Sequence, residues 1–153
     1  MSERDTIAEM LEGLRSADVN DRRYAAGWFN GEATWHGSLE VDSRDLDEII
    51  EILVDEDDKE IRTDLAEGVA ATVRYQKSYN LMPLYRYLTE MVQEAVESGE
   101  PLYEEEVGPI VEAFAYSSDD LKKDVWTLLD DLNDNLTRYI VDEMYDLEYN
   151  LER

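Results

Sequence analysis

Apolar residues recur along this chain at intervals of three and four positions, the period of an α-helix that buries one face. In the first half this spacing predicts helices over 7–14 and 21–29, a third that begins after Asp42 or Ser43, and a fourth over 61–79. The stretch 31–40 contains two glycines and shows no period, so we expect it to form the one long loop.

The second half of the chain continues the helical spacing. Pro83 suits the first turn of a helix that Gly99 and Pro101 end. The stretch 102–116 is helical by pattern, although Gly108–Pro109 is expected to kink or restart the helix. Helical spacing then continues from 118 to 153, with a break expected at 133–135.

Taken together, these patterns predict an all-α fold. No stretch alternates with the period of two that a half-buried β-strand requires, so we expect one domain, 1–153, of roughly six to eight helices. The apolar faces of these helices predict a core whose central members are Ile50, Leu53, Leu65, Val69, Leu88, Val92, Val125 and Leu129.

The first two predicted helical pairs align with one another. At a spacing of 39 residues, the apolar positions of the first helix match those of the third: Ile7, Met10, Leu11 and Leu14 with Leu46, Ile49, Ile50 and Leu53. At a spacing of 40, the second helix matches the fourth: Arg22, Ala25, Ala26 and Phe29 with Arg62, Leu65, Ala66 and Val69. A third copy of this second half is Leu121, Lys122, Val125, Trp126 and Leu129, and each copy follows an acidic turn (DVND, DEDDKE and SSDD).

An apolar helix, an Asp-rich turn and then an apolar-basic-x-x-small-small helix resemble HEAT-like α-helical repeats. The resemblance covers 5–30, 44–70 and 109–132, and it implies antiparallel helical hairpins whose turn Asp and helix Arg hold neighbouring repeats in register. The chain departs from the family at Trp126, where a small residue is usual, at Asp21, where the second copy has Ile61, and in the 60-residue gap before the third copy. An irregular helical bundle without a true repeat remains the alternative.

Charge is the dominant feature of the composition. The chain has 14 Lys and Arg against 39 Asp and Glu, a net charge of −25, which argues against binding a nucleic-acid backbone or an anionic membrane. The acid is spread evenly, with −12 in residues 1–76 and −13 in residues 77–153, and only 4 of the bases are Lys. This pattern resembles proteins of salt-in halophiles, because molar salt shortens the Debye length to about 3 Å and screens the self-repulsion.

Few catalytic or metal-binding arrangements fit this sequence. Without cysteine, and with His36 as the one histidine, thiolate nucleophiles, sulfur-ligated zinc and di-iron bundles built on Glu-x-x-His are excluded. Asp131, Asn133, Asn135 and Asp142 copy part of an EF-hand loop, but Leu136 replaces the required glycine, and helix capping explains the cluster better. We therefore predict no catalytic, metal or cofactor site.

Aromatic residues are the more suggestive excess. Tyr75/Tyr79 and Tyr145/Tyr149 are i, i+4 pairs that each share a helix face, and Trp35 and His36 lie in the expected loop. Tyrosine is frequent at protein interfaces, because a rigid apolar ring carries a polar tip, but it also packs half-buried between helices. These six residues are the candidates for contact with another protein.

We therefore predict a non-enzymatic scaffold or adaptor that binds another protein, or a second copy of itself, in a high-salt cytoplasm. The chain has no stretch of about 20 apolar residues, and its start lacks the layout of a signal peptide. The alternative is an acidic inhibitor, either a nucleic-acid mimic or an immunity-type protein, which would bind a basic nuclease or DNA-binding protein. Such a mimic needs its carboxylates in a continuous stripe rather than on all faces.

Overall fold

The computed structural model describes residues 3–36, 39–75, 79–100, 102, 104–115 and 119–130. Within these ranges the chain forms seven α-helices and no strand, which confirms the all-α fold. The helices are α1 (Glu3–Leu14), α2 (Val19–His36), α3 (Ser43–Asp55), α4 (Lys59–Tyr75), α5 (Met82–Ser98), α6 (Glu104–Phe114) and α7 (Asp119–Asp130).

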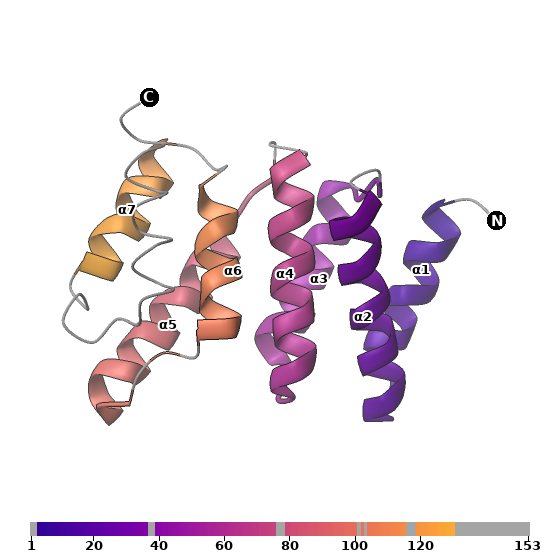
Figure 1. The fold of residues 1–153 in the computed structure, drawn as a ribbon, viewed down its shortest axis with the longest axis horizontal. Helices are drawn as coiled ribbons and strands as arrows, with labels where there is room; N and C mark the ends of the chain where they lie inside the picture. Colours follow the sequence, from indigo (N-terminus) through magenta and orange to yellow (C-terminus); the bar gives the residue numbers. More distant parts are fainter. Residues whose placement is uncertain are drawn as a thin grey trace.

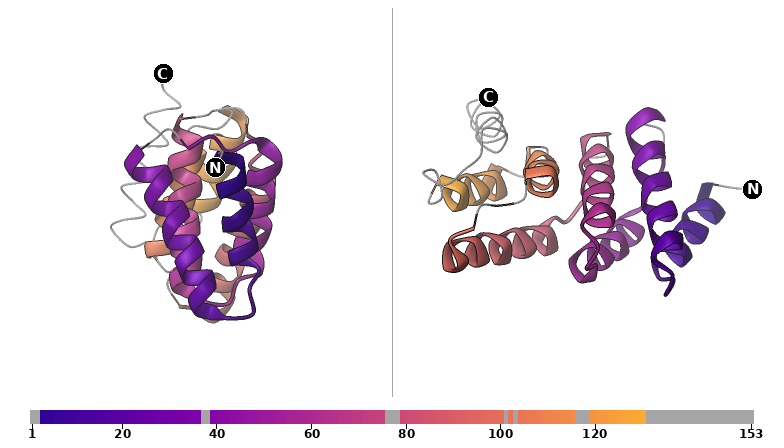
Figure 2. Two further views of the ribbon diagram at one scale, coloured as in Figure 1. Left: turned by 90° about the vertical axis from the view of Figure 1, so that its right-hand side faces the viewer. Right: turned by 60° about the horizontal axis from the view of Figure 1, so that its bottom comes forward.

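The helices stack as pairs in two layers. In Figure 1 the helices α2, α4 and α6 stand side by side, and the second view of Figure 2 shows α1, α3 and α5 as the layer beneath them. The pairs α1/α2 and α3/α4 are hairpins, and α4 packs between α2 and α6. Helix α7 contacts α5 and α6 at the far end of the array. The first hairpin, α1/α2, therefore has a neighbour on one side only among the described helices.

Several helix ends form where the sequence predicts them. Asp42 caps α3, because its side chain accepts a hydrogen bond from the backbone N–H of Asp45 at 2.8 Å. Asp58 caps α4 in the same way, through the N–H of Ile61 at 3.1 Å. Gly99 follows α5 with φ +73°, the left-handed conformation that glycine adopts at no steric cost.

The predicted core is confirmed. All eight of its central members are buried, with exposed fractions of 5% or less. The matched apolar positions of α1 and α3 are also buried, from Ile7 to Leu14 and from Leu46 to Leu53, and both sets belong to one continuous core. The 39-residue spacing in the sequence therefore corresponds to equivalent buried faces of two hairpins.

Three predicted boundaries are wrong. The stretch 31–40 is not one long loop, because α2 continues to His36: Ala33 is buried in the core, and this packing outweighs the low helix propensity of Gly31. Helix α4 ends at Tyr75 rather than at Tyr79. Helix α6 does not restart at Gly108–Pro109 but continues through them, because burial of Val107, Ile110 and Val111 in the core outweighs the lost hydrogen bond and the ring clash that Pro109 costs.

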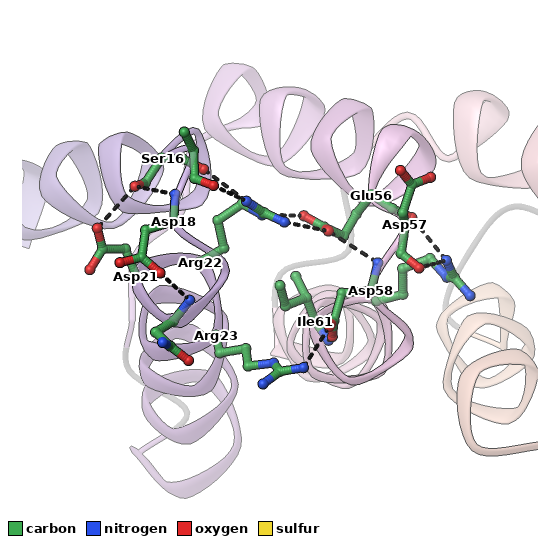
Figure 3. A network of polar contacts seen from close by, with 12 residues as sticks. Ser16, Asp18, Asp21, Arg22, Arg23, Glu56, Asp57, Asp58 and Ile61 are labelled. Atoms are coloured by element: carbon green, nitrogen blue, oxygen red, sulfur yellow. Dashed lines mark hydrogen bonds and ion pairs between the residues drawn. The ribbon is translucent and has the colours of Figure 1, made fainter.

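Two arginines at equivalent positions of α2 and α4 anchor each helix to the turn before it. Arg22 Nη1 donates to the carbonyl oxygens six and five residues earlier, at 3.0 and 3.1 Å (Figure 3). Arg62 Nη1 donates to the carbonyl oxygens six and five residues earlier, both at 2.9 Å. The sequence repeat is therefore also a repeat of hydrogen bonds.

The same two arginines reach forward to the next hairpin. Arg22 Nε lies 3.0 Å from Glu56 Oε2, and Arg62 Nε lies 3.0 Å from Glu106 Oε1. Both acceptor side chains are almost fully buried, at 6% and 3% exposed, and Tyr87 also donates its hydroxyl to Glu106 at 2.6 Å. We call Arg22, Glu56, Arg62 and Glu106 the arginine ladder. Because its ion pairs are largely shielded from water, salt screens them less than it screens the surface charges.

Candidate partner-binding surfaces

The predicted contact residues fall into described and undescribed parts of the chain. Trp35 and His36 are the last two residues of α2, and Tyr75 is the last residue of α4. Tyr145 and Tyr149 lie outside the described residues, as does the Asp131–Asn135 cluster. Four of the six predicted contact residues therefore lie in the described part of the chain.

Polar contacts show that α2 and α4 run side by side in the same direction. Near their starts, Arg23 Nη2 lies 2.8 Å from Asp58 Oδ2. Further along, Asn30 Nδ2 donates to Asp64 Oδ1 at 3.2 Å and to Glu67 Oε2 at 2.7 Å. The two helices consequently end at the same side of the molecule, so the fold brings the backbone of 35–36 close to the end of α4.

Tyr79 follows α4 at this same side and is used internally. Its hydroxyl donates to the backbone carbonyl of Val41, and its ring packs half-buried against the core. Burial, with a smaller contribution from the Asp42 carboxylate, raises the pKa of Tyr79 to about 12. The hydroxyl therefore stays protonated as a donor at neutral pH and links the segment before α3 to the segment after α4.

A groove of about 280 Å³ crosses α2, α4 and α6 at this side of the molecule. Its floor is apolar, with Ala71 and the buried Pro109, while Glu67, Arg74 and Glu112 supply charges of both signs. We call it the three-helix groove. A mixed-charge rim around a small apolar floor is typical of a protein-contact surface rather than of an enclosed ligand site.

The edge of α4 that faces α2 beside this groove is acidic. Glu60, Asp64 and Glu67 lie at i, i+4 and i+7 and so share one helix face. Burial beneath α2 raises the pKa of the Asp64 carboxyl, the hydrogen bond from Asn30 opposes the shift, and the Glu60 charge adds to it. The carboxylates of this face repel one another, and the Asn30 amide donates hydrogen bonds to two of them, Asp64 and Glu67.

A larger groove, of about 680 Å³, lies between α1 and α2, and the sequence analysis did not predict it. Tyr24 and Trp28 line it from α2, and Glu9 and Glu12 line it from α1. The i, i+4 spacing of Tyr24 and Trp28, which places both rings on one helix face, is the sequence signal for it. We call it the α1/α2 groove.

Other tyrosines serve the interior. Tyr87 donates to Glu106 within the arginine ladder, and burial followed by this hydrogen bond raises the pKa of its hydroxyl. The Tyr85 ring meets Phe114 edge to face, with ring centroids 6.3 Å apart. Part of the tyrosine excess is therefore explained by packing between α5 and α6.

Searches for known relatives add no assignment. The chain matches no protein-family model, and neither the curated proteins nor the solved structures give a significant match. In the part of the chain that the structure describes, no three potential metal-ligating side chains gather as a metal site. None of the described helices combines the length and apolarity needed to cross a membrane.

Proposed function

We propose that this chain is a non-enzymatic scaffold or adaptor, built of HEAT-like helical hairpins, which binds another protein in a high-salt cytoplasm. The observation that carries the proposal is the arginine ladder. Arg22 and Arg62 make the same two backbone contacts and the same kind of forward ion pair in successive hairpins. A repeat of hydrogen bonds, and not of apolar residues alone, favours stacked repeats over an irregular bundle.

The distribution of exposed carboxylates supports salt adaptation rather than nucleic-acid mimicry. A mimic would concentrate its acid on one face. Exposed carboxylates instead lie on helices of both layers: Glu9 and Glu12 on α1, Asp47 and Glu51 on α3, Glu60 and Glu67 on α4, and Glu94 and Glu97 on α5. At molar salt this general repulsion is screened, and the apolar contacts between helices then hold the stack.

A thermal melt followed by far-ultraviolet circular dichroism tests the salt adaptation. The melting temperature should rise steeply from dilute buffer to molar KCl, because the unfolded chain otherwise relieves the repulsion by expanding. Potassium sulfate at matched ionic strength separates screening from the kosmotropic strengthening of apolar burial. A melting temperature that stays flat in KCl would contradict the salt-adaptation proposal.

Capture from a lysate at high salt tests the binding role. The wild-type chain should enrich one specific protein, and we place that contact at the three-helix groove and the adjoining end of α2. The double variant Trp35→Ala/His36→Ala should lose the captured protein, and its melting temperature is measured in parallel so that a loss of fold is recognised. Arg44→Ala/Glu51→Ala, at two exposed positions of α3, is the matched control and should retain the protein. Equal capture by both variants would show that the partner contacts another surface. The absence of any specific captured protein would contradict the adaptor role.

A further inference from the structure

The α1/α2 groove owes its existence to departures from the repeat. Asp21 and Ala25 on α2 stand where the second hairpin has Ile61 and Leu65, both fully buried. Gly13 on α1 stands where α3 has Ile52. Small or polar residues thus replace three large apolar ones, and all three line the groove.

The chemistry of the groove is aromatic and anionic. Three carboxylates line it, those of Glu9, Glu12 and Asp21, and no Lys, Arg or His is among the lining residues that the structure describes. Tyr24 is 79% exposed, while Trp28, one turn later on the same face, is anchored because its ring packs partly against the core. The groove therefore offers negative charge beside two aromatic rings.

Two features hold this arrangement in place before any ligand arrives. The Ser16 hydroxyl donates to Asp21 Oδ2 at 2.9 Å and fixes that carboxylate. At Gly13, α1 approaches α2 so closely that a Cβ there would lie 3.0 Å from the Cβ of Ala25. A site whose groups are already positioned loses less conformational entropy when it binds.

We propose that the α1/α2 groove binds an arginine side chain presented by a protein partner, with the guanidinium between the carboxylates of Glu9, Glu12 and Asp21 and the rings of Tyr24 and Trp28. This inference rests on the proposed adaptor function and supplies the chemistry of one partner contact. A guanidinium fits because its flat face stacks on aromatic rings while its edge donates several hydrogen bonds to carboxylates. Stacking also allows recognition to persist at molar salt, where attraction between exposed charges alone is screened.

Titration with a minimal peptide tests the proposal on the folded chain in molar KCl. The probes are acetyl-Gly-Arg-Gly-amide and the same peptide with citrulline, a neutral isostere of arginine. Binding is followed by ¹H–¹⁵N NMR at the Trp28 indole and the Gly13 amide, with the indole signal assigned through Trp28→Phe. The arginine peptide should shift both signals and bind about tenfold more tightly than the citrulline peptide.

Matched variants separate a site from general attraction to an acidic protein. Glu9→Gln/Glu12→Gln/Asp21→Asn should weaken arginine binding about tenfold, and Tyr24→Ala should weaken it severalfold. The control Glu94→Gln/Glu97→Gln/Glu100→Gln removes the same charge from exposed positions of or just after α5 and should leave binding unchanged. Val96→Ala, at a side chain 61% exposed, is the control for loss of exposed apolar surface.

Three results would overturn the proposal. The first is equal affinity for the arginine and citrulline peptides, and the second is an equal loss from the two triple variants. The third is a dimer in analytical ultracentrifugation that dissociates in Tyr24→Ala, because the groove would then hold a second copy of the chain. If both triple variants still captured the partner protein, the proposed arginine site in the α1/α2 groove would be refuted and the adaptor role would stand. Peptide binding without any captured protein would refute the adaptor role alone.

Discussion

The outward side of α2 and the matching side of α4 occupy the same place in their hairpins but meet different surroundings. On α4 this side carries Ile61 and Gly68 and is buried, with Phe29 of α2 packed on Gly68. On α2 the equivalent residues are Asp21 and Trp28, which line an open groove. The comparison shows that one helix pattern can produce either a stacking face or an exposed surface, and that only a few side chains decide between them.

The arginines that follow Asp21 and Ile61 in the sequence are common to both helices. Arg22 and Arg62 make matching contacts to the turns before them, although one helix ends the described array and the other lies within it. Their forward partners differ, because Glu56 lies 34 residues after Arg22 in a turn, whereas Glu106 lies 44 residues after Arg62 in a helix. The arginine donors thus stand at equivalent positions of the two hairpins, whereas the glutamate acceptors come from positions that are not equivalent.

The largest expected effect is at the contact between Phe29 and Gly68. Phe29→Ala should lower the free energy of unfolding by about 3–5 kcal/mol, because the ring is fully buried. Gly68→Ala should cost about 1–3 kcal/mol in the wild-type chain, because its Cβ would lie 2.6 Å from Phe29 Cδ2. In the Phe29→Ala background the same glycine change should cost little, which urea unfolding in molar KCl can measure as a double-mutant cycle.

Gly27→Ala is the control for that cycle. Gly27 is exposed, and a Cβ there meets only Asp64 Oδ2 at 3.9 Å, so the change should stabilise α2 by about 0.5–1 kcal/mol. If Gly68→Ala proved equally harmless, the described approach of α2 to α4 would be incorrect.

Equivalent positions at the start of the two helices should differ almost as strongly. Ile61→Ala should cost about 3 kcal/mol, because its side chain is fully buried. Asp21→Ala should cost under about 1 kcal/mol, because Asp21 is exposed and loses only its bond from Ser16 and its favourable place in the first turn of α2. Urea unfolding of both variants measures the difference directly, and similar losses at the two positions would show that the first hairpin is covered as the second one is.

The two steps of the arginine ladder provide a finer comparison. Glu106→Gln should cost about 2 kcal/mol, since it leaves Arg62 without its anion at a site where the glutamate is only 3% exposed. Glu56→Gln should cost less, about 1 kcal/mol, because Arg22 is more accessible to water. Glu48→Gln, which removes the half-buried partner of the exposed Arg15, is the control and should cost under about 1 kcal/mol. A larger loss of stability from Glu56→Gln than from Glu106→Gln would contradict this expected order.

The sequence was sufficient for the helices, the core and the matched buried positions of the first two hairpins, because each follows from periodicity or from matched positions. It failed at Gly31 and at Gly108–Pro109, where local propensity favours a break and tertiary packing around Ala33 and along α6 overrides it. The spacing of Tyr24 and Trp28 marks an aromatic face but does not predict the α1/α2 groove, because an open space depends on what a neighbouring helix leaves unfilled. Tyr79 likewise shows that spacing alone does not distinguish an interface tyrosine from one bonded to a backbone carbonyl.

The smallest expected effect concerns Asp64, which replaces Tyr24 at the equivalent position of α4. Burial raises the pKa of the Asp64 carboxyl, so the folded state binds its proton more tightly than the unfolded state does. Stability contributed by this group therefore falls as pH rises from the ordinary range of an aspartate through the raised pKa, and the full penalty is present at neutral pH.

Asp64→Asn should remove that penalty while its side-chain carbonyl still accepts the hydrogen bond from Asn30. We expect a gain of less than about 0.5 kcal/mol at neutral pH, small because water partly screens the half-buried carboxyl. This gain shrinks as pH falls and disappears where the carboxyl is protonated in both states. Asp47→Asn, at an exposed position of α3, removes the same charge and is the control for general repulsion. Molar KCl should reduce the gain from Asp47→Asn more than that from Asp64→Asn, because salt screens repulsion but does not return water to a buried carboxylate. Urea unfolding of both variants across pH and salt measures these gains, and equal gains under all conditions would show that the Asp64 face of α4 is as open to solvent as the outward face of α2.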